Sequence, residues 1–316
     1  MDVPVDMRYL WDVTRNPFYM ANFDEVGPQD RTGFVLRNLL LAMKDYHQPD
    51  VNWAASVCLL GGTASSLNYE TIMEIKNMCP VIMATGPHAA GKTTALRACL
   101  STVGRLDYCG FSFVDFSAAC ALTEAETSSL PFGWDDPQSR DTVGTLIMQL
   151  YNKAGKTSCG KNAKPKSLPI VTSNFHQFGK VAKLDEAKRD GPRALASLIA
   201  LGERFREEAE QAALTEIETR LNTIFKEPRT AQVYALVLWF TRQCLLEAGM
   251  LSEMDKVWEF MEGTVTTMVM TNTGQGSASS TTKVISGIAT ALGSMTLREH
   301  TPVYLVFQLE AAHPRV

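Results

Sequence analysis

The residues from Gly86 to Thr93 form the strongest chemical motif in the chain. Their sequence, Gly-Pro-His-Ala-Ala-Gly-Lys-Thr, fits the pattern G-x-x-x-x-G-K-[ST] at every fixed position. Two glycines at this spacing let the backbone wrap a phosphate with its N–H groups, and a helix beginning at Lys92 adds its positive N-terminal end. The motif predicts a nucleoside-triphosphate site; a glycine-rich turn without a ligand is the alternative. The predicted nucleotide contacts are Gly86, His88, Ala89, Ala90, Gly91, Lys92, Thr93 and Thr94.

A nucleoside-triphosphate site of this kind also needs Mg²⁺, together with acidic residues that bind the metal and activate the attacking water. Lys92 would reach the β- and γ-phosphates, and the Thr93 hydroxyl would ligate the metal. Two segments could supply the acid, since Asp115 closes FSFVD and the pair Asp135 and Asp136 closes LPFGWDD. The pair is preferred because adjacent carboxylates supply both metal binding, assigned to Asp135, and a general base, assigned to Asp136. Acids followed by proline also open helices well, so a helix cap is the alternative.

A third polar residue follows another strand-like run. SLPIVTSN is apolar and ends in Asn174. If this strand lies beside the acid strand, the Asn174 amide can hydrogen-bond the attacking water or the γ-phosphate. Asn174 is therefore predicted to be catalytic.

Lysines are concentrated in one segment. Between Thr142 and Leu184 there are seven lysines and no acid, in a chain whose formal net charge is −4. A local excess of this kind suits contact with a phosphate backbone, although a solvated loop is the alternative. The nucleic-acid contacts are predicted to be Lys156, Lys161, Lys164 and Lys166.

The elements that must position these residues follow an α/β pattern. Between residues 80 and 175, apolar runs at 81–86, 110–117, 130–136 and 167–174 alternate with helical patterns at 93–103 and 139–151, which predicts a parallel sheet with crossover helices. Helical patterns precede this region at 34–43 and at 52–78, the second with a break at Gly61–Gly62. Charged helices follow residue 180. Near the C-terminus we expect strands at 264–273 and 302–309 with a helix at 283–295 between them.

Composition limits the class of protein. With 316 residues, of which 45% are hydrophobic, the chain is too apolar to be disordered. It has no apolar run long enough for a membrane span or a secretory signal, and its seven cysteines include no C-x-x-C pair. We therefore expect a reducing cytoplasmic or nuclear compartment, no membrane, no disulfide framework and no zinc site.

The order of these motifs resembles that in superfamily-3 helicases and related AAA+-type ATPases. It is similar above all to the helicase-like ATPase domains that occur with primases in mobile elements, over roughly residues 50–195. In that resemblance GPHAAGKT is the Walker A motif, WDD the Walker B motif and Asn174 sensor 1, and the lysine-rich segment matches a DNA-contacting hairpin. Arg189 or Arg193 would act on the nucleotide of a neighbouring subunit, and Arg189 is preferred.

The resemblance implies a P-loop NTPase of the ASCE type, with a parallel sheet and flanking helices. It would have an N-terminal helical segment (1–50), an ATPase core (51–195) and a helical and mixed C-terminal region (196–316). The implied function is ATP hydrolysis with Mg²⁺ by a helicase-like motor that acts on DNA as a homo-oligomer, such as a hexameric ring. A nucleotide-gated regulatory or scaffold protein with little turnover is the alternative, and a small-molecule kinase is a third.

Two features depart from the family. Pro131 and Gly133 interrupt the expected acid strand, and proline is poorly tolerated inside a central strand. Asp136 stands where the family usually has glutamate, which places the base about one bond further from its water. Slow hydrolysis would follow from the shorter side chain.

Overall fold

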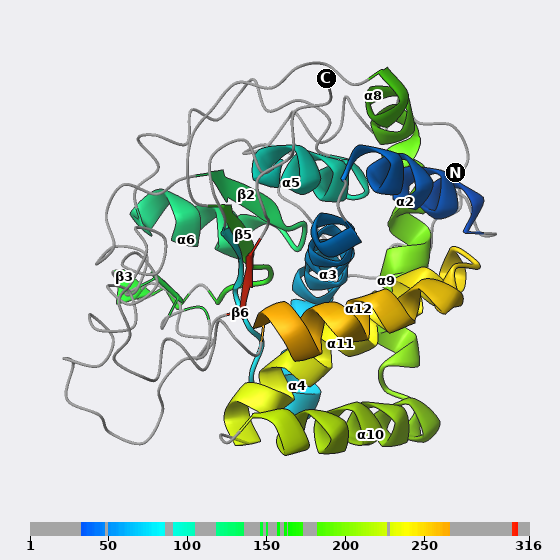
Figure 1. The fold of residues 1–316 in the computed structure, drawn as a ribbon. Helices are drawn as coiled ribbons and strands as arrows, with labels where there is room; N and C mark the ends of the chain where they lie inside the picture. Colours follow the sequence, from blue (N-terminus) through cyan, green and yellow to red (C-terminus); the bar gives the residue numbers. More distant parts are fainter. Residues whose placement is uncertain are drawn as a thin grey trace, which may run out of the picture.

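The computed structural model describes residues 33–47, 50–85, 91–104, 118–135, 146–147, 150, 157–158, 161–162, 164–172, 182–225, 228–265 and 305–308. Most of these residues are helical, and a small parallel sheet makes the fold α/β (Figure 1). The α-helices are α2 (Phe34–Tyr46), α3 (Asp50–Leu67), α4 (Tyr69–Lys76), α5 (Lys92–Ser101), α6 (Ala118–Thr127), α8 (Ala182–Asp190), α9 (Leu195–Arg204), α10 (Glu208–Ile224), α11 (Pro228–Glu247) and α12 (Met254–Phe260).

The sheet contains four parallel strands in the described part of the chain. They are β1 (Ile82–Thr85), β2 (Phe132–Asp135), β5 (Pro169–Thr172) and β6 (Leu305–Gln308), in the order β2-β5-β1-β6. Where their side chains are described, β1, β2 and β5 are buried, as expected for a parallel sheet covered by helices. The prediction of a parallel sheet with intervening helices is confirmed for these elements.

The acid strand forms despite its proline. Pro131 lies just before β2 and is not part of it, and β2 is one of the two edge strands among those described. Proline before a strand removes no hydrogen bond from the sheet. The irregularity seen in the sequence is therefore tolerated by the position of the strand.

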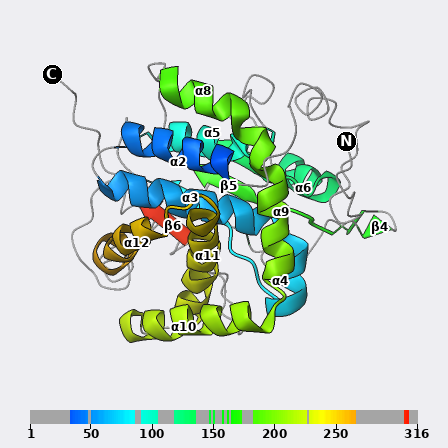
Figure 2. The ribbon, with the colours of Figure 1, turned by 90° about the vertical axis from the view of Figure 1, so that its right-hand side faces the viewer.

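Helix α3 lies at the centre of the helical region, packed against α5, α11 and α12 (Figures 1 and 2). Its described residues, from Asn52 to Leu67, are all buried, as expected of a helix that has apolar or small residues on every face. The predicted break at Gly61–Gly62 is wrong, because the helix runs through both glycines. A Cβ on Gly61 would lie 2.7 Å from the backbone nitrogen of Thr241 in α11, so glycine serves close packing here.

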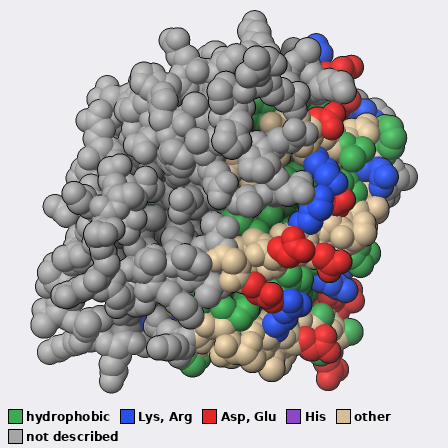
Figure 3. Space-filling view, in the orientation of Figure 1, with side chains coloured by type: hydrophobic (Ala, Val, Ile, Leu, Met, Phe, Trp, Pro, Cys, Tyr) green, Lys and Arg blue, Asp and Glu red, His purple; other side chains and the backbone are tan. Residues whose placement is uncertain are grey.

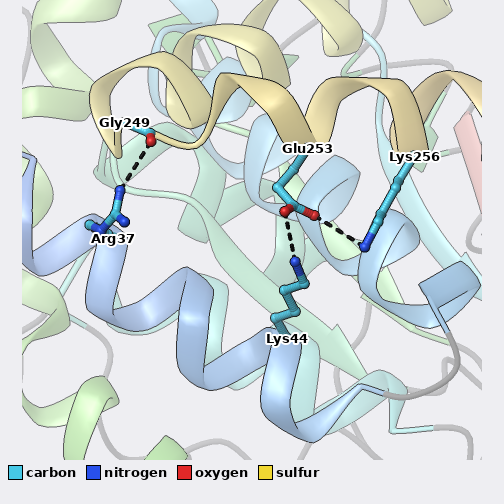
Figure 4. A network of polar contacts seen from close by, with 5 residues as sticks. All are labelled: Arg37, Lys44, Gly249, Glu253 and Lys256. Carbon is cyan, nitrogen blue, oxygen red and sulfur yellow. Dashed lines mark hydrogen bonds and ion pairs between the residues drawn. The ribbon is translucent and has the colours of Figure 1, made fainter.

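Helix α2 is fastened to the turn between α11 and α12 (Figure 4). The Arg37 guanidinium donates to the backbone oxygens of Ala248, at 3.1 Å, and Gly249, at 3.0 Å. The Lys44 ammonium pairs with the Glu253 carboxylate at 2.7 Å. In the described part of the chain, one core cluster contains buried apolar residues of the helices α2 to α6 and α9 to α12 and of the strands β1, β2 and β5.

The charged helices after residue 180 are confirmed, and their arginines bind across helices. Arg204 pairs with Glu247 at 2.6 Å, and Arg206 pairs with Glu74 at 2.7 Å. Arg204 thus joins α9 to α11, and Arg206, in the turn after α9, is joined to α4.

Several expected elements lie outside the described residues. These are the strand at 110–117, the helix at 283–295 and most of the helix at 139–151. The strand expected from residue 264 does not begin there, because Met261–Val265 form a helical segment. The last expected strand is confirmed as β6. Across the described ranges, no helix is both long enough and apolar enough to cross a lipid bilayer.

Candidate functional site

The phosphate-loop motif lies between β1 and α5, as predicted. β1 ends at Thr85 and α5 begins at Lys92, while Gly86, His88, Ala89 and Ala90 lie outside the described residues. The first turn of α5 is well packed, since Lys92 is 3% exposed and Thr93 is 5% exposed. Thr94 is half-buried. The backbone N–H groups of this turn have no partner within their own helix, which is the property that binds phosphate.

Gly91 has two reasons to be glycine. It caps α5 with φ 85° and ψ 13°, in the left-handed region that glycine adopts readily and residues with a side chain disfavour. A Cβ at this position would also lie 3.0 Å from Cε1 of His47. The second fixed glycine of the motif is therefore required by backbone conformation and by a close neighbour.

The acid strand and the Asn174 strand end at the same edge of the sheet. β2 pairs with β5, so the condition on which the role of Asn174 depends, that its strand lies beside the acid strand, is met. Asp135 is opposite Thr172, and Thr172 is opposite Ala84 of β1, so the three backbones lie on one line across the sheet. Asp135 is thus two strand spacings from β1, or about 10 Å.

This distance separates the end of the acid strand from the strand that leads into the phosphate-loop motif. Only the backbone of Asp135 is described, and Asp136, Asn174 and Asp115 lie outside the described residues. Because the carboxyl ends of parallel strands are where open α/β sheets bind ligands, the adjoining ends of β1, β5 and β2 form one candidate site. The ribbon places α5 over this part of the sheet (Figure 1).

The predicted metal ligands, Thr93 and Asp135, carry oxygen donors of the kind that Mg²⁺ takes. Among the described residues, no group of three or more His, Cys, Asp or Glu side chains gathers to hold a metal. Mg²⁺ does not need such a cage, because one or two protein oxygens and the substrate phosphates complete its octahedron. Thr93, in the first turn of α5, and Asp135, at the end of β2, are residues of the right type.

The lysine-rich segment contains an antiparallel hairpin. β3 (Thr157–Ser158) pairs with β4 (Lys161–Asn162), and the pair is peripheral in both ribbon views (Figures 1 and 2). Lys164 is exposed and Lys166 is half-buried, with the backbone N–H of Lys166 donating to Ala125 at 2.8 Å. Lys156 and the side chain of Lys161 lie outside what is described.

Over the described part of the face drawn in Figure 3, basic, acidic and apolar side chains are interspersed.

The two candidate arginines lie on neighbouring turns. Arg189 is exposed in the last turn of α8, which packs against α2 and α5. Arg193, in the short helix that follows, is half-buried and lies 3.7 Å from the carboxylate of Asp190. An arginine that acts on a neighbouring subunit must be accessible, so the exposure of Arg189 is compatible with that role.

Two residues at the end of α2 were not foreseen in the sequence. The Tyr46 hydroxyl lies 3.4 Å from the Thr94 hydroxyl, and His47 packs on Gly91. His47 is fully buried, and burial lowers its pKa to about 3, so its imidazole is neutral. No local pattern marks these residues, because their contacts join segments about 45 positions apart.

Comparisons with protein-family models, with curated proteins and with solved structures each found no match.

Proposed function

We propose that this protein is a Mg²⁺-dependent nucleoside triphosphatase, with ATP as the expected nucleotide, and that it works as a helicase-like oligomeric motor on DNA. The observation that carries the proposal is the meeting of three strand ends at one edge of the sheet. The phosphate-loop strand, the Asn174 strand and the acid strand end there side by side, in register at Ala84, Thr172 and Asp135.

Each residue of the proposed P-loop site has a distinct task. The backbone from Gly86 to Thr94 would hold the phosphate chain, and Lys92 would neutralise charge on the β- and γ-phosphates. Thr93 and Asp135 would hold Mg²⁺, which stabilises the charge that develops during hydrolysis. The remaining polar groups would act on the attacking water.

Asp136 and Asn174 are the residues proposed for that water. Asp136 follows the last residue of β2, and Asn174 follows β5 by two residues. Because β2 and β5 are adjacent, the two strands that these residues follow end side by side. Asp136 would accept the proton of the water, while Asn174 would orient it.

Oligomerisation and DNA binding are supported by exposed basic residues. Arg189 would reach the nucleotide of the next subunit, where an arginine stabilises the transferred phosphoryl group. The hairpin and Lys164 would contact the DNA backbone, so binding should weaken as salt is added.

A steady-state ATPase assay with and without single-stranded DNA, alongside size-exclusion chromatography in nucleotide, tests the proposal. We expect Mg²⁺-dependent turnover, stimulation by DNA and a ring-sized species. Lys92→Ala should abolish turnover, and Arg189→Ala should abolish it without abolishing nucleotide binding. Lys188→Ala, one position away on α8, is the matched control and should remain active.

Other outcomes separate the alternatives. Tight nucleotide binding with negligible turnover and no response to DNA would favour a regulatory or scaffold protein. Transfer of the γ-phosphate to a metabolite would favour a kinase. If the wild-type protein bound no nucleoside triphosphate, the whole proposal would be wrong.

A further inference from the structure

The C-terminal end of α2 forms an aromatic corner, Tyr46 and His47, against the first turn of α5. His47 caps α2, with its backbone N–H donating to Met43 at 2.8 Å, and its side chain is buried. The two rings meet edge to face, with their centroids 4.7 Å apart. The imidazole is therefore held in place by its attachment to the end of α2 and by its contact with the Tyr46 ring.

The edge of the imidazole formed by Cε1 and Nδ1 faces Gly91, the residue before α5. A Cβ built on Gly91 would lie 3.0 Å from Cε1 and 3.3 Å from Nδ1. Nε2 is bonded to Cε1, so it is within a few ångströms of the helix N-terminus. Gly91 has no side chain to separate this ring from a group bound there.

Nε2 of His47 has no hydrogen-bond partner among the described residues, although it is buried. A buried polar atom without a partner costs free energy, so such atoms are rare unless a ligand satisfies them. The N-terminus of α5 is an anion-binding position by its backbone alone. A phosphate oxygen at this position would accept hydrogen bonds from Nε2–H of His47 and from the backbone N–H groups at the N-terminus of α5.

We propose that His47 is a phosphate-contacting residue, whose Nε2–H donates a hydrogen bond to an oxygen of the nucleotide's phosphate chain beside Gly91. The inference rests on the proposed nucleotide site. It differs from the role of Lys92, because the imidazole is neutral and adds direction without adding charge. It also makes α2, which lies outside the motif, part of the binding site.

Two substitutions separate the hydrogen bond from packing. His47→Leu has a similar volume and removes the donor, whereas His47→Gln keeps an N–H donor near the place of Nε2. Isothermal titration calorimetry with Mg·ADP and with pyrophosphate would measure Kd for each variant. We expect His47→Leu to weaken both ligands by about 10- to 100-fold, the range for a hydrogen bond to a charged group, and His47→Gln to restore most of the loss.

The stability of the ligand-free protein supplies a second readout. His47→Leu removes a buried polar atom that has no partner, so its unfolding temperature should equal or exceed that of the wild type. A merely structural histidine predicts the opposite, namely a lower unfolding temperature in the absence of ligand. That result, or wild-type affinity for pyrophosphate in a folded His47→Leu protein, would overturn the proposal.

Nitrogen NMR of the wild-type protein covers the case in which His47→Leu does not fold. The Nε2 resonance of His47, assigned by its absence from His47→Gln, should move when pyrophosphate is added. An unchanged resonance in protein shown to bind pyrophosphate would refute the role of His47 alone. Failure of the wild type to bind any nucleotide or pyrophosphate would instead refute the nucleotide site itself.

Discussion

Replacing Gly61 by alanine should destabilise the protein, although the same change stabilises most helices. Alanine is favoured over glycine inside a helix by about 1 kcal/mol. At position 61, however, the new Cβ would lie 2.1 Å from Oγ1, 2.7 Å from the backbone nitrogen and 2.8 Å from Cα of Thr241. Two of these atoms belong to the backbone of α11, so no side-chain rotation relieves the overlap.

The size of the effect follows from overpacking. Forcing an extra methyl group into a packed interface costs about 1–3 kcal/mol, and a backbone clash lies at or above the upper end. After the gain in helix propensity is subtracted, we expect a net loss of about 2 kcal/mol. With an unfolding entropy of about 2.1 cal/mol/K per residue, a chain of 316 residues loses about 3 °C in unfolding temperature.

Thermal unfolding followed by far-ultraviolet circular dichroism would measure the difference. Gly263→Ala is the matched control, because a Cβ there would meet no atom within 4 Å. This control should unfold at or slightly above the wild-type temperature. If Gly61→Ala were as stable as Gly263→Ala, then α3 and α11 would not approach as closely as described, and the explanation for the glycine would be wrong.

Three further predictions concern buried and paired groups. Burial raises the pKa of Glu253, but the hydrogen bond and charge of Lys44 and the charge of Lys256 outweigh this effect and lower it overall. A lowered pKa stabilises the fold above the ordinary value near 4.5, and this contribution is lost as pH falls from there through the lower folded-state pKa. Glu253→Gln should therefore cost at most about 1 kcal/mol at pH 7, because solvent screens the pair, and progressively less as pH falls below 4.5 in chemical denaturation; a pH-independent cost would contradict this. Tyr69→Phe should lower stability by about 1 kcal/mol, because the Tyr69 hydroxyl donates to the Leu150 oxygen at 2.7 Å in a buried position; no loss in denaturant titration would contradict that bond. Burial covers four of the seven thiols and raises their pKa; these are Cys58, Cys79, Cys99 and Cys244. In Ellman's assay at pH 8, at most three thiols should therefore react before unfolding. A fourth fast-reacting thiol would contradict the packing of these four cysteines.

The elements that the sequence predicted best are those with a local signal. β1 is an apolar run of strand length before a glycine, and α2 has apolar residues at helical spacing, so both were predictable. The break at Gly61–Gly62 was wrong because glycine was interpreted locally, whereas its cause is the nearness of α11. The local sequence around Gly61 gives no information about how closely α11 approaches α3.

The same limit applies to the candidate site. The order of the phosphate loop, the acids and Asn174 could be predicted, because each follows a strand in the sequence. The insertion of β5 between β1 and β2 could not be predicted from spacing, since strand order depends on how the crossover helices pack. His47 was missed for a related reason, because only the folded chain brings it to Gly91.

The pairing of β1 with β6 determines how much of the sheet can form while the chain is still being synthesised. Ile82 is paired with Leu305, so one neighbour of the phosphate-loop strand is synthesised more than two hundred residues after the strand itself. Until then, that edge of β1 exposes unpaired backbone groups, which invite pairing with other chains. Contacts this distant in sequence also form slowly. A nascent chain that ends before β6 therefore contains the whole phosphate-loop motif on an incomplete sheet, and it should depend on chaperones at a stage when the finished protein would not.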